Sequence, residues 1–262
     1  MKVRVLGCAA DIGQGCKTTA FLVDCHLLID AGTGVGNLTR EEMLAIDDVF
    51  LTHAHIDHIA CLPLMVSATI IARAGRPLRV HALPPTLQAL RAHIFNDIIW
   101  PDFSRLPTPA APAITLHPLR IGEPVTLARG HTVEPLPASH GVPACGFAVR
   151  DRPHHAPWWV FSGDTEHCPA FWQRINTLRV GALTIETTFP SRERALAHLT
   201  KHLCSNTLAA ELDQIAPGTR YPIYITHAKS AEGKTILREI TRLNHPPAHG
   251  LHMLHAGQVF EI

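Results

Sequence analysis

The chain has little of several features that would assign it to other classes of protein. None of its apolar runs approaches the roughly 20 residues that a membrane-spanning helix needs, and its 262 residues carry a formal net charge of only +1. Such a balance gives no electrostatic reason to expect a nucleic acid as partner. The first residues alternate like a strand and lack the long apolar core of a signal peptide. The sequence therefore predicts a soluble, cytoplasmic protein with no membrane partner.

Cysteine is present without the pattern that would give it a structural task. There are 7 cysteines, an odd number, and no two of them form a C-x-x-C pair. This argues against both a disulfide framework and a thiolate zinc site. We interpret most of them as small buried apolar groups.

Histidine is abundant, with 19 in the chain, and the segment from Thr52 to His58 reads T-H-A-H-I-D-H. Neutral imidazole is the usual nitrogen ligand of zinc, and a neighbouring carboxylate lets the same segment serve a second ion. Residues 48–52 favour a short buried strand, and residues 59–72 favour an apolar helix. Because α/β proteins place their chemistry at the carboxyl ends of strands, this segment predicts a metal site.

The order of apolar patterns predicts two sheets with helices on their outer faces. We expect a first set of strands at 2–6, 20–24, 26–30, 48–51 and 78–82, with helices at 56–74 and 84–96. A second set is expected at 113–116, 124–127, 132–137, 146–150, 158–162, 180–186 and 222–226, with helices at 169–177, 205–215 and 233–243.

Two stretches do not fit this rhythm. The proline-rich segment 97–125 is either a loop with a few core contacts or an apolar flap or subunit contact. The C-terminal histidines favour a solvated hairpin over an adventitious metal site; they are residues 245, 249, 252 and 255.

Three further metal-binding candidates lie where later strands become loops. His140 follows residues 132–137, Asp164 follows an apolar run in the turn-like S-G-D-T, and His227 closes the strand 222–226. Each residue taken singly is more often structural. Their order behind the first histidine segment indicates a dinuclear site.

The whole series resembles the metallo-β-lactamase superfamily of dinuclear hydrolases, over nearly the full chain. The resemblance implies an α/β fold, the four-layer αββα sandwich of two mixed sheets, as one domain over 1–262. The implied first metal set is His53, His55 and His140. The implied second set is Asp57, His58 and His227, with Asp164 bridging. The two ions would be about 3.5–4 Å apart with a hydroxide between them. The donor set suits Zn²⁺, while Mn²⁺ or Fe stays open.

One branch of this superfamily needs an acid for its leaving group. The stretches around Glu186 and His198 resemble the Glu-containing and His-x-Thr motifs of ribonuclease Z and of class II 3′,5′-cyclic nucleotide phosphodiesterases. The resemblance implies that His198 protonates the leaving oxygen and that Glu186 orients it. On the residues alone, a surface histidine is the competing interpretation. Residues 93–96 and 226–229 also resemble the phosphodiesterases, and Asn96 is a candidate for substrate binding. Lys229, two residues beyond His227, is either a ligand for a phosphate oxygen or an ordinary surface lysine.

We therefore predict hydrolysis of 3′,5′-cyclic nucleotides, cAMP or cGMP, to 5′-nucleotides. The bridging hydroxide would attack phosphorus, Asp57 would hydrogen-bond it, and His198 would be the general acid. No basic, glycine-rich arm for gripping tRNA is present, which weakens the alternative of a ribonuclease Z-like tRNA 3′-end nuclease. Another hydrolase of this fold, and a metal-stabilised cyclic nucleotide sensor without activity, are further alternatives. The base preference and a homodimer stay open.

Overall fold

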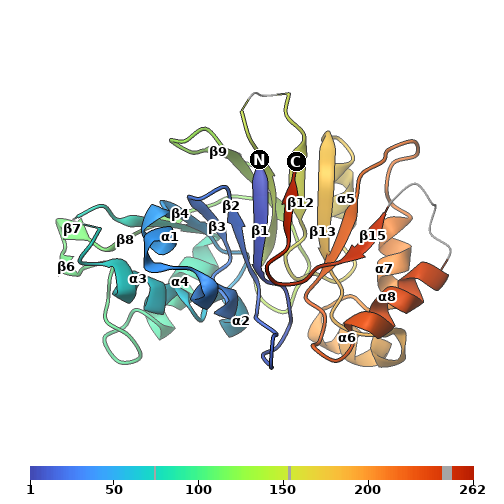
Figure 1. The fold of residues 1–262 in the computed structure, drawn as a ribbon, viewed down its shortest axis with the longest axis horizontal. Coiled ribbons are helices and arrows are strands. Elements are labelled where there is room, and N and C mark those ends of the chain that lie inside the picture. The colour runs from blue at the N-terminus through green and yellow to red at the C-terminus, as the bar shows by residue number, and fades with distance from the viewer. Residues whose placement is uncertain (74, 153–154, 244–249) are drawn as a thin grey trace.

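Two seven-stranded mixed sheets pack face to face in the computed structural model, with helices on the outer face of each (Figure 1). The structure describes residues 1–73, 75–152, 155–243 and 250–262. This arrangement confirms the predicted four-layer αββα sandwich. Each sheet buries its inner face against the other sheet and its outer face against helices, which is why both sheets need a helix layer.

The first sheet has the strand order β16 (Val259–Glu261), β1 (Lys2–Gly7), β2 (Ala20–Val23), β3 (Leu27–Ile29), β4 (Asp48–Phe50), β5 (Leu78–Ala82) and β8 (Ile114–Pro118). The second has the order β15 (Leu251–Met253), β14 (Ile223–Thr226), β13 (Val180–Glu186), β12 (Trp158–Phe161), β11 (Cys145–Arg150), β10 (Thr132–Pro137) and β9 (Val125–Thr126). A small pair, β6 (Pro107–Thr108) and β7 (Ala111–Pro112), stands apart.

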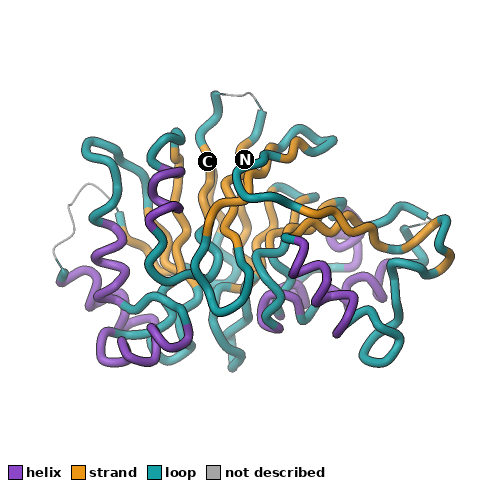
Figure 2. The backbone as a smooth tube through the Cα atoms, turned by 180° about the vertical axis from the view of Figure 1, so that it is seen from behind, coloured by secondary structure: helices purple, strands orange, loops and turns teal. Residues whose placement is uncertain are grey.

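Helices cover the outer faces, as the view from behind also shows (Figure 2). The first sheet packs against α1 (Arg40–Ala45), α3 (Leu62–Thr69) and α4 (Pro84–His93). The second packs against α5 (Pro169–Ile175), α7 (Ser205–Leu212) and α8 (Gly233–Arg242). Shorter elements lie in the connections: η1 (Thr33–Asn37), α2 (Ile56–Ile59), η2 (Ser191–Glu193) and α6 (Arg194–Thr200).

Side chains of the central strands alternate between the inter-sheet core and the helix layers. On β2, Phe21 joins the inter-sheet core while Leu22 packs under the helices. On β12 in the second sheet, Trp159 and Phe161 also join the inter-sheet core. The Phe21 ring meets both edge-on, at centroid distances of 5.4 and 5.0 Å. Each such buried side chain contributes about 1.5–3 kcal/mol, so these contacts fix the two sheets against each other.

The predicted long helix at 56–74 is instead two helices, α2 and α3. Pro63 near the start of α3 has no backbone N–H to continue the preceding turn, which accounts for the break. The sequence did not predict α1, which begins with a capping box between Thr39 and Glu42. It did not predict α6 either.

The two irregular stretches have separate outcomes. In the proline-rich segment, Phe103 packs 6.1 Å from Phe95 in the first helix layer, whereas Ile98 is 86% exposed. The predicted C-terminal hairpin is wrong, because β15 extends the second sheet beside β14 while β16 pairs with β1 in the first. His245 and His249 lie outside the described residues. Among the described residues, every helix is too short or too polar to cross a bilayer.

Candidate metal centre

Seven predicted ligands converge at one edge of the sandwich, from strand ends of both sheets. The segment after β4 in the first sheet supplies four, and the loops after β10, β12 and β14 in the second supply His140, Asp164 and His227. Their ligand atoms form two groups, and within each group all atoms lie within 4.8 Å of one another. One group is His53, His55 and His140; the other is Asp57, His58, Asp164 and His227.

Asp164 lies between the two groups. Its Oδ2 is 3.2 Å from Nε2 of His58 and 3.3 Å from Nε2 of His227, and it is 3.7 Å from Nε2 of His53 in the other group. Ligands at the usual 2.0–2.2 Å from one cation lie roughly 3.0–3.5 Å from each other. The spacing therefore suits side chains that share bound ions, with Asp164 in the bridging position.

Two buried atoms of the cluster give an independent test of whether cations fit. Over the described part of the chain, neither Nε2 of His53 nor Oδ1 of Asp164 has a hydrogen-bond partner. An unsatisfied buried polar atom costs about 1–3 kcal/mol, and a cation would remove that cost. Imidazole nitrogens with carboxylate oxygens suit divalent transition metals. The cluster is thus suited to divalent metal ions.

The far side of each buried histidine is held by a specific partner. Nδ1 of His58 lies 2.8 Å from Oδ2 of Asp30, and Nδ1 of His53 lies 3.0 Å from Oγ1 of Thr52. Asp30 is fully buried, adopts a left-handed φ of 56°, and accepts the Thr52 backbone N–H at 2.8 Å. Such outer partners fix which nitrogen faces the metal. No role for Asp30 was predicted from the sequence. Its position indicated one, because this carboxylate directly follows a buried strand, β3, that pairs with β4.

The same arrangement recurs in the second sheet. Nδ1 of His140 lies 2.9 Å from the backbone oxygen of Lys201, and Nδ1 of His227 lies 3.0 Å from Oγ1 of Thr188. In His53, His58, His140 and His227, the Nδ1 edge is therefore engaged and the Nε2 edge turns toward the cluster.

Burial and charge set the protonation of the cluster. Burial, reinforced by the charge of His58, lowers the pKa of His53 well below its ordinary value, and burial also lowers the pKa of His140. Burial opposes the charge on His58, but the carboxylates of Asp164 and Asp30 outweigh it and raise the pKa of His58. Metal ligands must be deprotonated, so binding a cation here would displace the His58 proton.

A buried acid–base pair lies beside the cluster. Glu186, fully buried at the end of β13, has Oε1 2.8 Å from Nδ1 of His202. The His202 ring centroid is 4.9 Å from that of His140 and 5.3 Å from that of His227. Burial lowers the pKa of His202, but the charge and hydrogen bond of Glu186 outweigh burial and raise the pKa to about 9.

The predicted pairing of Glu186 with His198 is therefore wrong. The His198 side chain is 78% exposed on α6, and its Nδ1 lies 3.2 Å from Oε2 of Glu166. Helix α6 ends at Thr200, and the left-handed φ of 59° at the following Lys201 turns the chain so that His202 enters the site. The signal was a repeated His-Leu dipeptide: His198-Leu199 occurs first, but in His202-Leu203 the histidine side chain is only 12% exposed and the leucine is buried.

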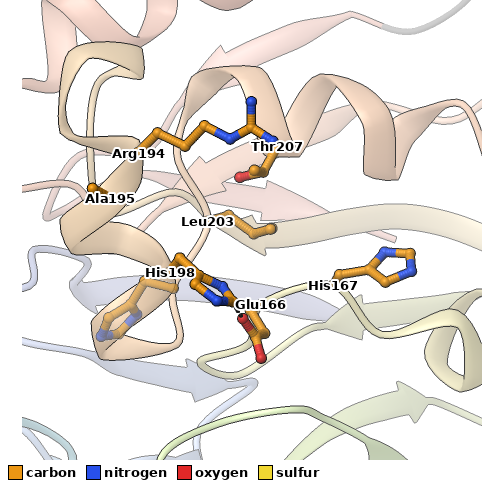
Figure 3. Close-up of a pocket in the computed structure, with 8 residues that line it drawn as sticks. Glu166, His167, Arg194, Ala195, His198, Leu203 and Thr207 are labelled. Carbon is orange, nitrogen blue, oxygen red and sulfur yellow. Dashed lines mark hydrogen bonds and ion pairs between the residues drawn. The ribbon is translucent and has the colours of Figure 1, made fainter.

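A pocket of about 580 Å³ opens next to His202 (Figure 3). In the close-up, Arg194 and Thr207 lie together on one side, with Glu166 and His198 on the other. Arg194 is exposed, whereas the Glu166 carboxylate is held 2.5 Å from Nζ of Lys201. A polar ligand that reaches His202 would thus meet both a cation and a carboxylate.

The two predicted substrate-binding residues have other surroundings. The side-chain oxygen of Asn96 accepts the backbone N–H groups of Ile98 and Ile99, and its nitrogen donates to the Ala92 oxygen. This bonding favours a turn-forming role for Asn96 over substrate binding. Lys229 has Nζ 6.0 Å from the Phe189 ring centroid and lines a second pocket of about 490 Å³ rather than the one beside His202. A substrate contact by Lys229 stays a prediction.

Comparison with known proteins places this geometry in a family. The model described as "Beta-lactamase superfamily domain" matches residues 26–225, and the chain belongs to this superfamily. Unliganded yeast PDE1 has the same fold, with a TM-score of 0.85 at 18% identity over 100% of this chain and 99% of that one. Human tRNase Z, short form, gives a TM-score of 0.70 at 16% identity, over 100% and 99%.

Sequence relatives are shorter matches. The 3′,5′-cyclic-nucleotide phosphodiesterase 1 of Saccharomyces cerevisiae is 35% identical over 66 residues, which is 25% of this chain and 18% of the relative. A ribonuclease Z of Thermococcus sibiricus is 20% identical over 80% of this chain and 84% of its own length. The chain spans less than two thirds of the first three relatives, 18%, 38% and 57%. Together these matches identify a member of the β-lactamase superfamily with the metallo-β-lactamase fold.

Proposed function

We propose that this chain hydrolyses the phosphodiester bond of 3′,5′-cyclic nucleotides to give 5′-nucleotides. The observation that carries the proposal is the contact of the buried Glu186 with His202 beside the seven-residue cluster. An alkoxide leaving group needs a proton, and a histidine at this place can donate one. Divalent ions in the cluster, zinc or alternatively manganese or iron, would supply an activated water and neutralise charge on the phosphoryl oxygens.

The chain's own residues would then divide the work. Asp57, at the first turn of α2, has Oδ2 3.2 Å from Nε2 of His227 and would accept a hydrogen bond from the attacking water. His202 would protonate the departing 3′ oxygen from its Nε2, because its Nδ1 is held by Glu186. The pocket beside His202 would take the rest of the nucleotide, with Arg194 as a cationic contact.

The size of the substrate follows from the surroundings of His202. A pocket of about 580 Å³ is in the range of small-molecule sites. The net charge of +1 gives little driving force from counterion release on a long polyanion. Both observations favour a mononucleotide over a folded RNA.

The test is a panel of substrates with the purified protein: 3′,5′-cAMP, 3′,5′-cGMP, a 2′,3′-cyclic nucleotide and a precursor tRNA, each with and without a chelator. The proposal expects chelator-sensitive release of 5′-AMP or 5′-GMP. Cyclic nucleotide that binds without turnover would instead indicate a sensor.

A second candidate is tRNA 3′-end processing. The alignment with the ribonuclease Z of Thermococcus sibiricus over 80% of the chain favours it. Cleavage of the precursor tRNA with no turnover of either 3′,5′-cyclic nucleotide would replace the first proposal with this one.

A further inference from the structure

A second cluster of metal-ligating side chains lies at the opposite edge of the sandwich. Asp24 follows β2 in the first sheet, while His131 precedes β10 and Asp151 follows β11 in the second. One ligand atom from each lies within 4.8 Å of the other two. His140 stands at the other end of β10, and a six-residue strand spans roughly 20 Å. The cluster is therefore separate from the centre described above.

Among the three, His131 is the residue that indicates a ligand, because one of its ring nitrogens is buried without a hydrogen-bond partner among the described residues. Its side chain is 4% exposed, and Nε2 lies 2.8 Å from Oδ2 of Asp24 and 4.0 Å from Oδ1 of Asp151. Despite these short distances, Nε2 has no hydrogen-bond partner among the described residues. An N–H on that nitrogen therefore does not meet the hydrogen-bond geometry toward the Asp24 oxygen, although the two atoms lie within ion-pair distance.

The other nitrogen of the ring shows which protonation state fits. Nδ1 of His131 lies 3.2 Å from Nε2 of His26, which is also buried, so one ring must donate to the other. If His26 donates, or if His131 carries both protons, the Nε2–H of His131 is buried without an aligned acceptor. If His131 donates from Nδ1, its Nε2 lone pair faces two carboxylates. With no ion bound, a lone pair of His131 that faces two carboxylates is unfavourable, because all three groups are electron-rich. A cation between the three groups would make the same arrangement favourable.

We propose that Asp24, His131 and Asp151 hold a divalent transition-metal cation, zinc or manganese, with water completing its coordination. One imidazole and two carboxylates match the ligand preferences of these ions. His26 would accept the Nδ1–H of His131 at 3.2 Å, in the place that a carboxylate, a carbonyl oxygen or water usually takes beside a metal-bound histidine. Asp24 is held in turn, because its Oδ1 accepts the backbone N–H of Lys2 at 2.9 Å. The α-amino group of Met1 lies 4.0 Å from Asp151 and is one cation that a bound ion would have near it.

The cation would join the two sheets at the edge where the chain termini lie (Figure 1). Asp151 has a side chain that is 40% exposed, which leaves a route for the ion from solvent. We assign this ion a structural role, because its ligands would come from both sheets and would tie one to the other.

The test counts bound metal rather than activity. Full-length wild-type protein, Asp151→Asn and the matched control Asp47→Asn are dialysed against the same free Zn²⁺ concentrations, and protein-bound zinc is measured by mass spectrometry. Asp47 is a neighbouring carboxylate that pairs with Arg129 at 2.8 Å and lies outside the cluster. We expect Asp151→Asn to bind one equivalent less than wild type and Asp47→Asn to bind as much as wild type. Equal binding by all three proteins would overturn the proposal.

Crystals give the second measurement. Anomalous scattering at the zinc edge should show a peak bonded to Nε2 of His131 in wild type and none there in Asp151→Asn. Absence of that peak in zinc-soaked wild-type crystals also overturns the site. Neither readout depends on hydrolysis, so failure of this site and failure of the proposed phosphodiesterase activity are distinguishable.

Discussion

Nδ1 of His202 lies 2.8 Å from Oε1 of Glu186, and this contact fixes the direction of the imidazole at the edge of the ligand cluster. Glu186 cannot turn away, because it also accepts the backbone N–H groups of Thr165 and Thr188 at 3.1 and 3.2 Å. The Nε2 edge of His202 therefore points away from Glu186 and is available to a ligand. The first two predictions follow from this geometry.

Replacing His202 by alanine should lower turnover of 3′,5′-cAMP by roughly 10²–10⁴, the usual contribution of a general acid. The loss should be much smaller on bis(4-nitrophenyl) phosphate, because nitrophenolate leaves without a proton. Steady-state kinetics on both substrates check this. His198→Ala is the comparison variant, and it should lose less than His202→Ala on cAMP. Equal losses by His202→Ala on the two substrates would remove His202 from the acid role.

Glu186→Gln should reproduce the leaving-group dependence of His202→Ala, because Glu186 acts by positioning that ring. It should therefore slow cAMP hydrolysis by about tenfold or more while circular dichroism shows a folded protein. The double variant should be no slower than His202→Ala alone, since residues that act as a unit are not additive. Additive losses would show that Glu186 has a separate task.

Asp30→Asn should weaken metal binding although every ligand is intact. Asp30 orients His58 at 2.8 Å, and loss of such an outer partner typically costs 10–100-fold in metal affinity. Competition with a chromophoric chelator measures the change. Asp48→Asn is the matched control, because Asp48 is another buried carboxylate that bonds a histidine, His81, outside the cluster. Equal affinity losses in the two variants would contradict the prediction.

Asp48 should contribute to stability in a pH-dependent way. Burial raises its pKa, but hydrogen bonds from His81 and Arg79 outweigh burial and hold the pKa below the ordinary 3.8. A carboxyl with a lowered folded-state pKa stabilises the protein above its unfolded pKa, and that contribution is lost as the pH falls through the folded value. Asp48→Asn should therefore cost about 2 kcal/mol at pH 7, and the cost should shrink below pH 4. Urea unfolding from pH 7 to pH 3 measures both; a cost that stays constant would refute the assignment.

The sequence could predict those parts of the molecule that depend on local pattern. The strands 78–82, 132–137 and 180–186 coincide with β5, β10 and β13, because each combines apolar alternation with clear turn signals at its ends. The seven candidate ligands could be selected because so dense a histidine segment seldom arises by chance and because the later candidates follow strand ends. That these residues come together depends on the tertiary fold, and only the resemblance to a known family predicted it.

What the sequence could not predict depends on single backbone turns. His198 and His202 both precede leucine, and only the left-handed Lys201 decides which of them enters the site. The sequence also could not predict that β15 and β16 belong to different sheets, because three-residue strands are too short to show a pattern of alternating apolar residues. Asp30 was missed because its partner His58 is 28 residues away in sequence.

The ligand donors come from both sheets, and this origin has a consequence for the stability of the fold. The segment after β4 brings four of them and the second sheet brings three, so neither half alone offers a complete set. An ion held by donors from both sheets would bind the folded chain more tightly than the unfolded one. Such an ion would therefore stabilise the packing of one sheet on the other as well as serve a reaction.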